Sequence, residues 1–223
     1  MTETVEKGGT RRPQAAREAA AIRSLARRLA RAGVRPNRIS QAGLLAAILS
    51  GAFLWAGGEA GSAPLLLLGA CLAGLRLLAN LLDGLVAIEG GLAEADGPFW
   101  NEVPDRLSDA AVLVGAGLAA GLPALGWAGA ALAILTAYVR EAGTALGLAA
   151  DFRGPFAKPQ RMAGIAAGAV IAALLLWAGV REGALALGAA LWLVTLGTGL
   201  TAFRRALGLR AALLSRDRSP GSG

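Results

Sequence analysis

Six apolar stretches, each close to twenty residues long, dominate this chain of 223 residues. An α-helix needs about 20 apolar residues to cross the hydrocarbon core of a bilayer. Only helices and closed barrels satisfy their backbone hydrogen bonds there, and the stretches lack the alternating pattern of barrel strands. We therefore predict an all-α integral membrane protein with six transmembrane helices, at roughly 40–57, 64–82, 105–121, 124–148, 162–180 and 184–203.

The distribution of Lys and Arg predicts the orientation of these helices. Residues 1–39 contain ten of the 22 basic residues, and further basic residues lie in the loop 149–161 and after residue 203. The connections on the opposite side contain only Arg181. Because cytoplasmic loops carry the excess of Lys and Arg, we expect both termini on the cytoplasmic side of a bacterial inner (cytoplasmic) membrane.

The chain divides into three segments by composition. We predict a cytoplasmic leader over 1–39, a six-helix membrane domain over 40–205 and a basic tail over 206–223. In the leader, Ile22, Leu25, Ala26 and Leu29 follow helical spacing, which predicts a basic amphipathic helix on the inner leaflet; a solvated basic arm is the alternative. Residues 1–10 and the final SPGSG are expected to be disordered.

Composition also excludes several kinds of chemistry. The chain has no histidine, which removes Ser-His and Cys-His catalysis and His-ligated zinc. Its one cysteine, Cys71, lies in an apolar stretch, so we expect no internal disulfide and no Cys-rich metal site. The net charge of +7 is explained by membrane orientation and an anionic lipid surface, so no nucleic-acid partner is expected.

The acidic residues gather in one short part of the chain. Seven of the 15 acidic residues lie within 27 positions: Asp83, Glu89, Glu94, Asp96, Glu102, Asp105 and Asp109. Ionisable groups at membrane depth are costly, which makes them candidates for function.

Their spacing places them on two helix faces. Asn80 and Asp83 share a face at the end of the second apolar stretch, and Asn101, Asp105 and Asp109 share a face at the start of the third, with Pro104 expected in its first turn. Oxygen ligands of this kind suit Mg²⁺ or Mn²⁺. The alternative is that these acids cap helix ends and pair with Arg106 or Arg76.

The segment around these residues resembles the signature of the CDP-alcohol phosphatidyltransferases, D-x-x-D-G-x-x-A-R followed by G-x-x-x-D-x-x-x-D. Asp83, Gly84, Ala87, Gly97 and Asp105 match it, whereas Asn80, Ile88 and Asn101 replace Asp, Arg and Asp. Two further segments are similar to the family: the entry to the first membrane helix, 33–40, and the basic loop 153–161. The resemblance covers about residues 33–205.

The resemblance implies a role for each matching residue. Asp105 would be the catalytic base, and Asp83, Asp105, Asn80 and Asn101 would bind one or two Mg²⁺ or Mn²⁺ ions, with Glu102, Asp109 or Glu89 as possible substitutes. CDP would bind to Gly84, Ala87 and Gly97, with Asn80 and Asp83. Lys158, Arg161 and Arg140 are candidates for binding a phosphate on the acceptor, and simple loop charge is the alternative explanation of the first two.

The resemblance implies an enzyme of phospholipid biosynthesis. It would transfer a phosphatidyl group from CDP-diacylglycerol to a small alcohol such as glycerol 3-phosphate, with release of CMP. A catalytically impaired relative that binds CDP-lipid or acts as a scaffold is one alternative, and a membrane transporter is another. The transporter is disfavoured because the acids all lie at one level of the bundle. The Gly- and Ala-rich helix faces would permit a homodimer.

Overall fold

The computed structural model describes residues 11–217, and all the regular secondary structure in that range is helical. The expected disordered segments, 1–10 and SPGSG, lie outside the described residues. The elements are α1 (Arg11–Arg31), α2 (Pro36–Glu59), α3 (Ala63–Gly90), α4 (Gly97–Ala119), α5 (Pro123–Ala145), α6 (Lys158–Trp177), a short 3₁₀ helix η1 (Arg181–Gly183) and α7 (Ala184–Asp217). The fold class predicted from hydropathy is thus confirmed as all-α.

Prolines and glycines set the ends of these helices. A proline occupies the first turn of each of α2 to α6, where its missing N–H costs no intrahelical hydrogen bond. Gly91 follows α3 with φ of 61°, a left-handed conformation that ends a helix most readily at glycine. Gly33, with φ of 73°, lies in the turn between α1 and α2. Helix α1 therefore ends just before Gly33, and α2 begins at Pro36.

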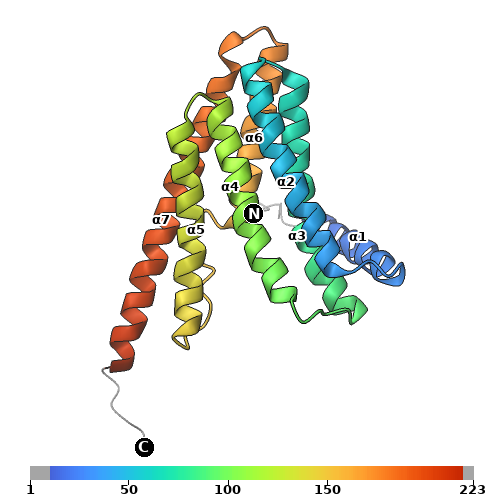
Figure 1. The fold of residues 1–223 in the computed structure, drawn as a ribbon, viewed down its shortest axis with the longest axis vertical. Helices are drawn as coiled ribbons and strands as arrows, with labels where there is room; N and C mark the ends of the chain where they lie inside the picture. Colours follow the sequence, from blue (N-terminus) through green and yellow to red (C-terminus); the bar gives the residue numbers. More distant parts are fainter. Residues whose placement is uncertain (1–10, 218–223) are drawn as a thin grey trace, which may run out of the picture.

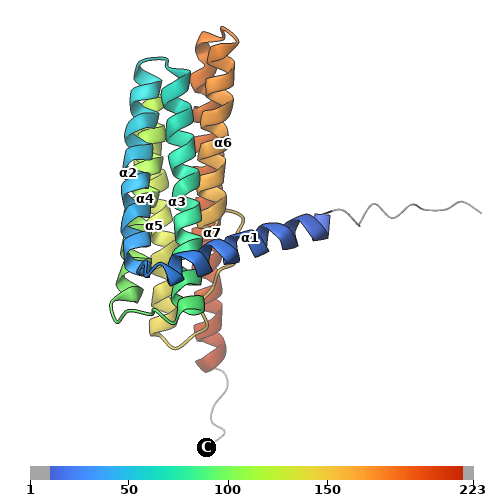
Figure 2. The same ribbon diagram turned by 90° about the vertical axis from the view of Figure 1, so that its right-hand side faces the viewer.

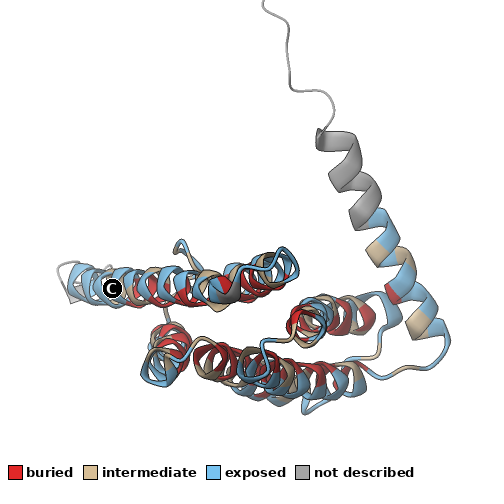
Figure 3. Cartoon of the chain, turned by 90° about the horizontal axis from the view of Figure 1, so that it is seen from above, coloured by how far each residue is buried: buried red, intermediate tan, exposed pale blue. Residues whose placement is uncertain are grey.

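Helices α2 to α7 form a closed bundle in which the neighbours around the ring are α2, α3, α6, α7, α5 and α4 (Figure 1). The view along the bundle shows the buried residues on the facing sides of these helices (Figure 3). Leu54, Leu66, Leu113, Ile165 and Leu191, from five different helices, are almost fully buried in one core cluster. Many Leu and Trp side chains lie on the outside, as a lipid environment permits.

Four of the helices are long and apolar enough to cross a membrane: Pro36–Glu59, Ala63–Gly90, Lys158–Trp177 and Ala184–Arg216. Helices α4 and α5 lie in the same bundle and pack against each other and against α2 and α7. Each helix has polar turns at the lower end in Figure 1, which lowers its mean hydropathy without shortening it.

Small residues bring α2 and α4 into backbone contact. A Cβ added at Gly51 would lie 2.2 Å from the carbonyl oxygen of Ala111, and a Cβ added at Gly115 would lie 2.4 Å from the Cα of Gly51. Backbones can approach this closely only where side chains are absent, which is the usual means of packing helices in lipid. These glycines therefore fix the separation of α2 and α4, on which the candidate site depends.

Helix α1 lies across the end of the bundle and points away from it (Figure 2). Its Ala26 is fully buried against a small cluster with Val86 and Leu82 of α3. Arg27 also donates a hydrogen bond of 3.3 Å to Glu89. Ile22 and Leu29 also pack against this cluster, whereas Leu25, Arg23, Arg28 and Arg31 are exposed.

Two predicted helix ends are wrong. Helix α3 continues beyond Asp83 to Gly90, so Asp83 lies about two turns inside it. Helix α4 starts at Gly97, so Pro104 is inside the helix and Pro98 occupies its first turn. Both helices extend past the apolar stretch because polar residues continue a helix freely outside the hydrocarbon core. Helix α7 likewise runs unbroken to Asp217, through most of the predicted tail.

Candidate active site

A cavity of about 260 Å³ lies at the end of the bundle where α2 and α4 begin and α3 ends. Asp83, Gly84 and Ala87 line it from α3, and Gly97 and Asn101 line it from α4. A Cβ added at Gly84 or at Gly97 would meet no atom within 4 Å, so both glycines leave open space in the cavity. Five residues singled out from the sequence therefore line one cavity, although the loop 91–96 separates them in the chain.

Two residues of α2 that line the cavity, Asn37 and Ser40, form hydrogen bonds to the loop 91–96 and to α3. Ser40 Oγ donates a hydrogen bond of 2.7 Å to Asp83 Oδ2, and the backbone N–H of Gly84 donates one of 2.7 Å to Asp83 Oδ1. Asn37 Nδ2 donates to Asp96 Oδ1 at 2.8 Å, which ties the loop to α2. Sequence reasoning assigned no role to Asn37 or Ser40, although both lie in the segment 33–40 that resembles the family.

Asp105 faces two cations instead of open space. Its Oδ1 accepts hydrogen bonds from Arg76 of α3 and from Lys158 at the start of α6. Lys158 Nζ also donates to Asn80 Oδ1, and Arg76 Nε donates to Ser108 Oγ at 2.9 Å. The Arg76 side chain is 1% exposed, the Lys158 side chain 13% and the Asp105 side chain 10%. The pairing of an acid with Arg76, weighed as an alternative from the sequence, is thus present.

Asp109 and Arg161 form a second buried ion pair, between α4 and α6. Arg161 NH2 donates to Asp109 Oδ2, and Arg161 NH1 donates to the carbonyl of Phe156 at 3.0 Å. Asp109 is 0% exposed and Arg161 is 3% exposed, and neither lines the cavity beside Asp83. Both residues, listed as candidates from the sequence, thus contact each other and hold α6 against α4.

Glu102, Glu89 and Ile88 do not line the cavity beside Asp83. Glu102 of α4 accepts hydrogen bonds from Arg106, four residues along the same helix, and from Arg140 of α5 at 2.7 Å. Glu89 pairs with Arg27 of α1. Ile88, where the signature has Arg, is 81% exposed on the outside of α3. Glu102 and Glu89 are therefore each held by an arginine of another helix.

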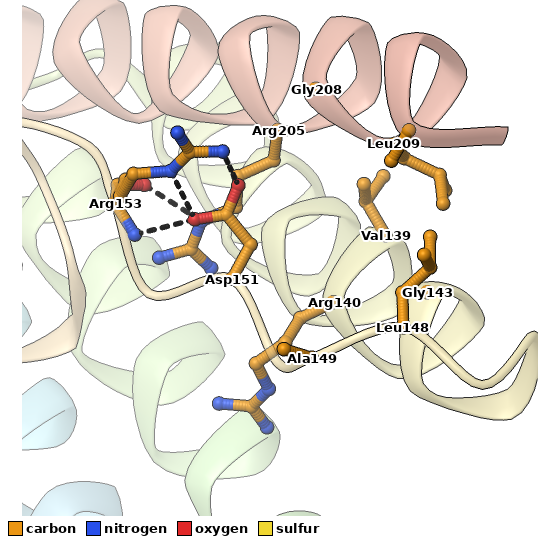
Figure 4. Close-up of a pocket in the computed structure, with 11 residues that line it drawn as sticks. Val139, Arg140, Gly143, Leu148, Ala149, Asp151, Arg153, Arg205, Gly208 and Leu209 are labelled. Carbon is orange, nitrogen blue, oxygen red and sulfur yellow. Dashed lines mark hydrogen bonds and ion pairs between the residues drawn. The ribbon is translucent and has the colours of Figure 1, made fainter. Parts of the chain in front are cut away.

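A second cavity, of about 250 Å³, lies between the end of α5, the loop after it and α7 (Figure 4). Arg140, Arg153 and Arg205 line it together with Asp151. Arg205 Nε donates to the carbonyl of Arg153 at 3.0 Å, and the Arg153 side chain donates two hydrogen bonds of 3.0 Å to Asp151. The hydrogen bonds and charge of Arg153 lower the pKa of Asp151 below its ordinary value, so this carboxylate remains ionised at neutral pH.

The oxygen donors at the motif positions are two carboxylates and two amides. In the described part of the chain, no three Asp, Glu, Cys or His side chains lie close enough together to hold a metal ion. Asp83 and Asp105 supply the two negative charges at these positions, and the amide carbonyls of Asn80 and Asn101 supply oxygen without charge.

Solved structures with a similar fold are known. The chain resembles the phosphatidylinositol phosphate synthase PgsA1 of Mycobacterium tuberculosis with CDP-DAG bound, with a TM-score of 0.68 and 24% identity over 84% of this chain and 92% of that one. The structure of the same enzyme in complex with manganese and citrate gives a TM-score of 0.70 at 24% identity, covering 84% of this chain and 88% of that one.

The apo form gives a TM-score of 0.65 at 24% identity, covering 83% of this chain and 94% of that one. The chain has the PgsA1 fold. It matches no protein-family model and no curated protein sequence. The fold is shared over most of both chains, and the cavity of about 260 Å³ is lined by residues at motif positions.

Proposed function

We propose that this protein is a CDP-alcohol phosphatidyltransferase of phospholipid biosynthesis. The observation that carries the proposal is the cavity of about 260 Å³ in which Asp83, Gly84, Ala87, Gly97 and Asn101 meet. These residues occupy positions of the family signature, and the similar fold of PgsA1 has been solved with CDP-DAG bound. CDP-diacylglycerol is the proposed donor, with its CDP group in this cavity and its acyl chains in the surrounding lipid.

The proposed topology has six transmembrane helices, α2 to α7, with both termini and the cavity on the cytoplasmic side. The excess of Lys and Arg at the lower end of the bundle supports this orientation. Helix α1 would lie on the inner leaflet, since Ala26 faces α3 while Arg23, Arg28 and Arg31 are exposed. A CDP-lipid can then reach the cavity from the membrane while its nucleotide stays in water.

The proposed reaction exchanges the phosphoanhydride bond of the donor for a new phosphoester bond. The oxygen of the acceptor hydroxyl attacks the phosphorus that carries the diacylglycerol, and the bond from that phosphorus to the oxygen of CMP breaks. Asp105 takes the proton of the hydroxyl, and CMP leaves with the electron pair of the broken bond. Arg76 and Lys158 hold the Asp105 carboxylate in place from two helices.

The cofactor proposed is Mg²⁺ or Mn²⁺, bound by Asp83 and Asp105 with the amide oxygens of Asn80 and Asn101. Hard oxygen donors suit such an ion, and a PgsA1 structure is in complex with manganese. The bound ion would offset negative charge on the diphosphate. Two carboxylates balance the charge of one divalent ion, so these residues fit one ion better than two.

The acceptor is proposed to carry a phosphate, as glycerol 3-phosphate does. Arg140, Arg153 and Arg205 line the second cavity, and a planar guanidinium binds phosphate through paired hydrogen bonds. This group replaces most of the set suggested by the sequence, because Arg161 is committed to Asp109 and Lys158 to Asp105. Only Arg140 belongs to both sets.

The proposal is tested by following CMP release from CDP-diacylglycerol by the purified protein with Mg²⁺ or Mn²⁺ and a panel of alcohols. We expect release that requires a metal ion and one acceptor, and that falls at least 100-fold in Asp105→Asn, as for loss of a general base. A protein that releases no CMP with any acceptor is not this enzyme.

A matched pair of glycine variants tests the location of the CDP site. Gly84 and Gly74 both lie in α3, and a Cβ added at either would meet no atom within 4 Å, but only Gly84 lines the cavity. Both Ala variants should be at least as stable as the native protein. Gly84→Ala should raise the KM for the CDP-lipid at least threefold, and Gly74→Ala should leave it unchanged. Equal effects would place the nucleotide elsewhere.

A non-catalytic CDP-lipid-binding protein is the second candidate. The observation that favours it is the pairing of Asp105 with two cations, which occupy the Oδ1 oxygen of the proposed base. In the same assay this candidate predicts CDP-lipid binding that depends on Gly84, with no CMP release.

A further inference from the structure

We propose that the Lys158 ammonium takes the place of a second divalent ion in this site and contacts the diphosphate of the substrate directly. This inference rests on the proposed function, and it concerns the more exposed of the two cations, Arg76 and Lys158, that contact both Asn80 and Asp105. It would make the protein a single-metal variant of a site that, in the family it resembles, holds a metal pair between four aspartates.

The first step is the position of the ammonium. Lys158 is the first residue of α6, and its Nζ contacts Asn80 Oδ1 of α3 and Asp105 Oδ1 of α4. Both oxygens belong to positions where the signature has metal-binding aspartates. A second ion held between these two oxygens, in addition to the one proposed above, would have to displace this ammonium. The chain therefore places its own cation where a metal would bridge α3 and α4.

The second step is charge. The buried acids Asp83, Asp105 and Asp109 are matched in number by the bases that lie among them, the buried Arg76 and Arg161 and the half-buried Lys158. With amides at positions 80 and 101, the group has no surplus of negative charge for two divalent ions. Like charges repel strongly where water is largely excluded, so the cations already present disfavour a second ion.

The third step is capacity for a ligand. An ammonium has three N–H donors, and Asn80 and Asp105 accept two of them. Lys158 is not among the residues that line the cavity beside Asp83, but its side chain is 13% exposed on a flexible four-carbon stem, so its third donor can turn toward a phosphate oxygen held there. Arg76 is 1% exposed and donates to Ser108 as well as to Asp105, which makes it a positioning residue for the carboxylate.

The presence of Lys158 accounts for the replacement of aspartate by Asn80 and Asn101. Asp105, the one carboxylate that contacts the ammonium, also faces Arg76, whereas four carboxylates around the same two cations would leave a negative excess. The two asparagines are thus the changes that a lysine in the metal position requires.

The test measures binding, so it does not depend on turnover. Calorimetry with CDP-dioctanoylglycerol would be done on the purified protein in EDTA and in Mg²⁺, for the native chain, Lys158→Gln and Arg38→Gln. Arg38 is an exposed residue of α2, so Arg38→Gln removes the same charge at a position away from Asn80 and Asp105. We expect native binding in EDTA that Lys158→Gln weakens at least tenfold, as loss of a charge-assisted hydrogen bond implies, with Arg38→Gln unchanged. Equal affinities in Lys158→Gln and the native protein would overturn the proposal.

Counting bound Mn²⁺ by electron paramagnetic resonance gives a second result that needs no variant. We expect at most one tightly bound Mn²⁺ in the native chain and two in the triple variant Asn80→Asp, Asn101→Asp, Lys158→Gln. Two ions in the native chain would overturn this inference while leaving the transferase proposal intact. Absence of CMP release, with binding in EDTA that depends on Lys158, would overturn the transferase and leave this inference intact.

Discussion

The buried pair of Asp109 and Arg161 allows a quantitative test of the structure. Both side chains are almost fully buried, and Asp109 Oδ1 and Arg161 Nε lack any hydrogen-bond partner in the structure. Arg161→Met would leave the Asp109 carboxylate buried without a counter-charge. Removing one partner of a buried ion pair costs about 3–5 kcal/mol. In a chain of this size, where 1 kcal/mol shifts the melting temperature by about 2–4 °C, the fall should be about 6–20 °C.

The double variant Arg161→Met, Asp109→Leu should recover most of that loss. It replaces both charges with apolar side chains of similar size, and such a replacement of a buried pair is often neutral or stabilising. Thermal unfolding in detergent, monitored by circular dichroism, would compare the two single variants with the double variant. The difference between the double variant and the sum of the singles measures the coupling of the pair.

Arg27→Met is the matched control, because Arg27 pairs with Glu89 at 3.3 Å but is 49% exposed. A pair this exposed contributes about 0–1 kcal/mol, so its melting temperature should change by less than about 4 °C. If Arg161→Met lowers the melting temperature by no more than Arg27→Met does, then Asp109 and Arg161 do not form the buried pair seen in the structure. If the double variant melts like the native protein but binds phosphorylated acceptors poorly, Arg161 has the binding role first suggested by the sequence.

Two further predictions concern packing and acceptor binding. Gly51→Val should lower the melting temperature by about 2–12 °C, since its Cβ would lie 2.2 Å from the carbonyl oxygen of Ala111 and overpacking costs about 1–3 kcal/mol; a melt within 1 °C of the native protein would refute the close contact of α2 and α4. Asp151→Asn removes the carboxylate that competes for Arg153, so the KM for a phosphorylated acceptor should fall about threefold or more while that for an unphosphorylated alcohol stays the same. A rise in the first KM would show that Asp151 itself binds the acceptor.

Much of the candidate site could be predicted from the sequence. The spacing of Asp83, Gly84, Ala87, Gly97 and Asn101 follows a signature, and residues three or four apart on a helix share a face whatever the rest of the fold does. Their meeting in one cavity follows once two helices are joined by a short loop. Asn37 and Ser40 were missed as site residues because their partners, Asp96 and Asp83, lie more than forty positions along the chain.

The ends of α3 and α4 were predicted too short for a related reason. Hydropathy marks where a helix lies in lipid, whereas hydrogen bonding decides how far it continues in water. Helix α4 therefore begins at Gly97, and Pro104 is accommodated inside it. The helix tolerates this proline because only one hydrogen bond, to the carbonyl four residues earlier, is lost.

The sequence by itself determined the all-helical class, because apolar length and spacing are local properties that each segment carries alone. It also determined that the acids lie at one end, since their positions follow from the order of the helices. Only the tertiary structure decided which cation each acid faces. Arg76 and Lys158 are 29 and 53 positions from Asp105, and Arg161 is 52 positions from Asp109. Electrostatic pairing depends on distance in space, which the packing of α3, α4 and α6 alone establishes.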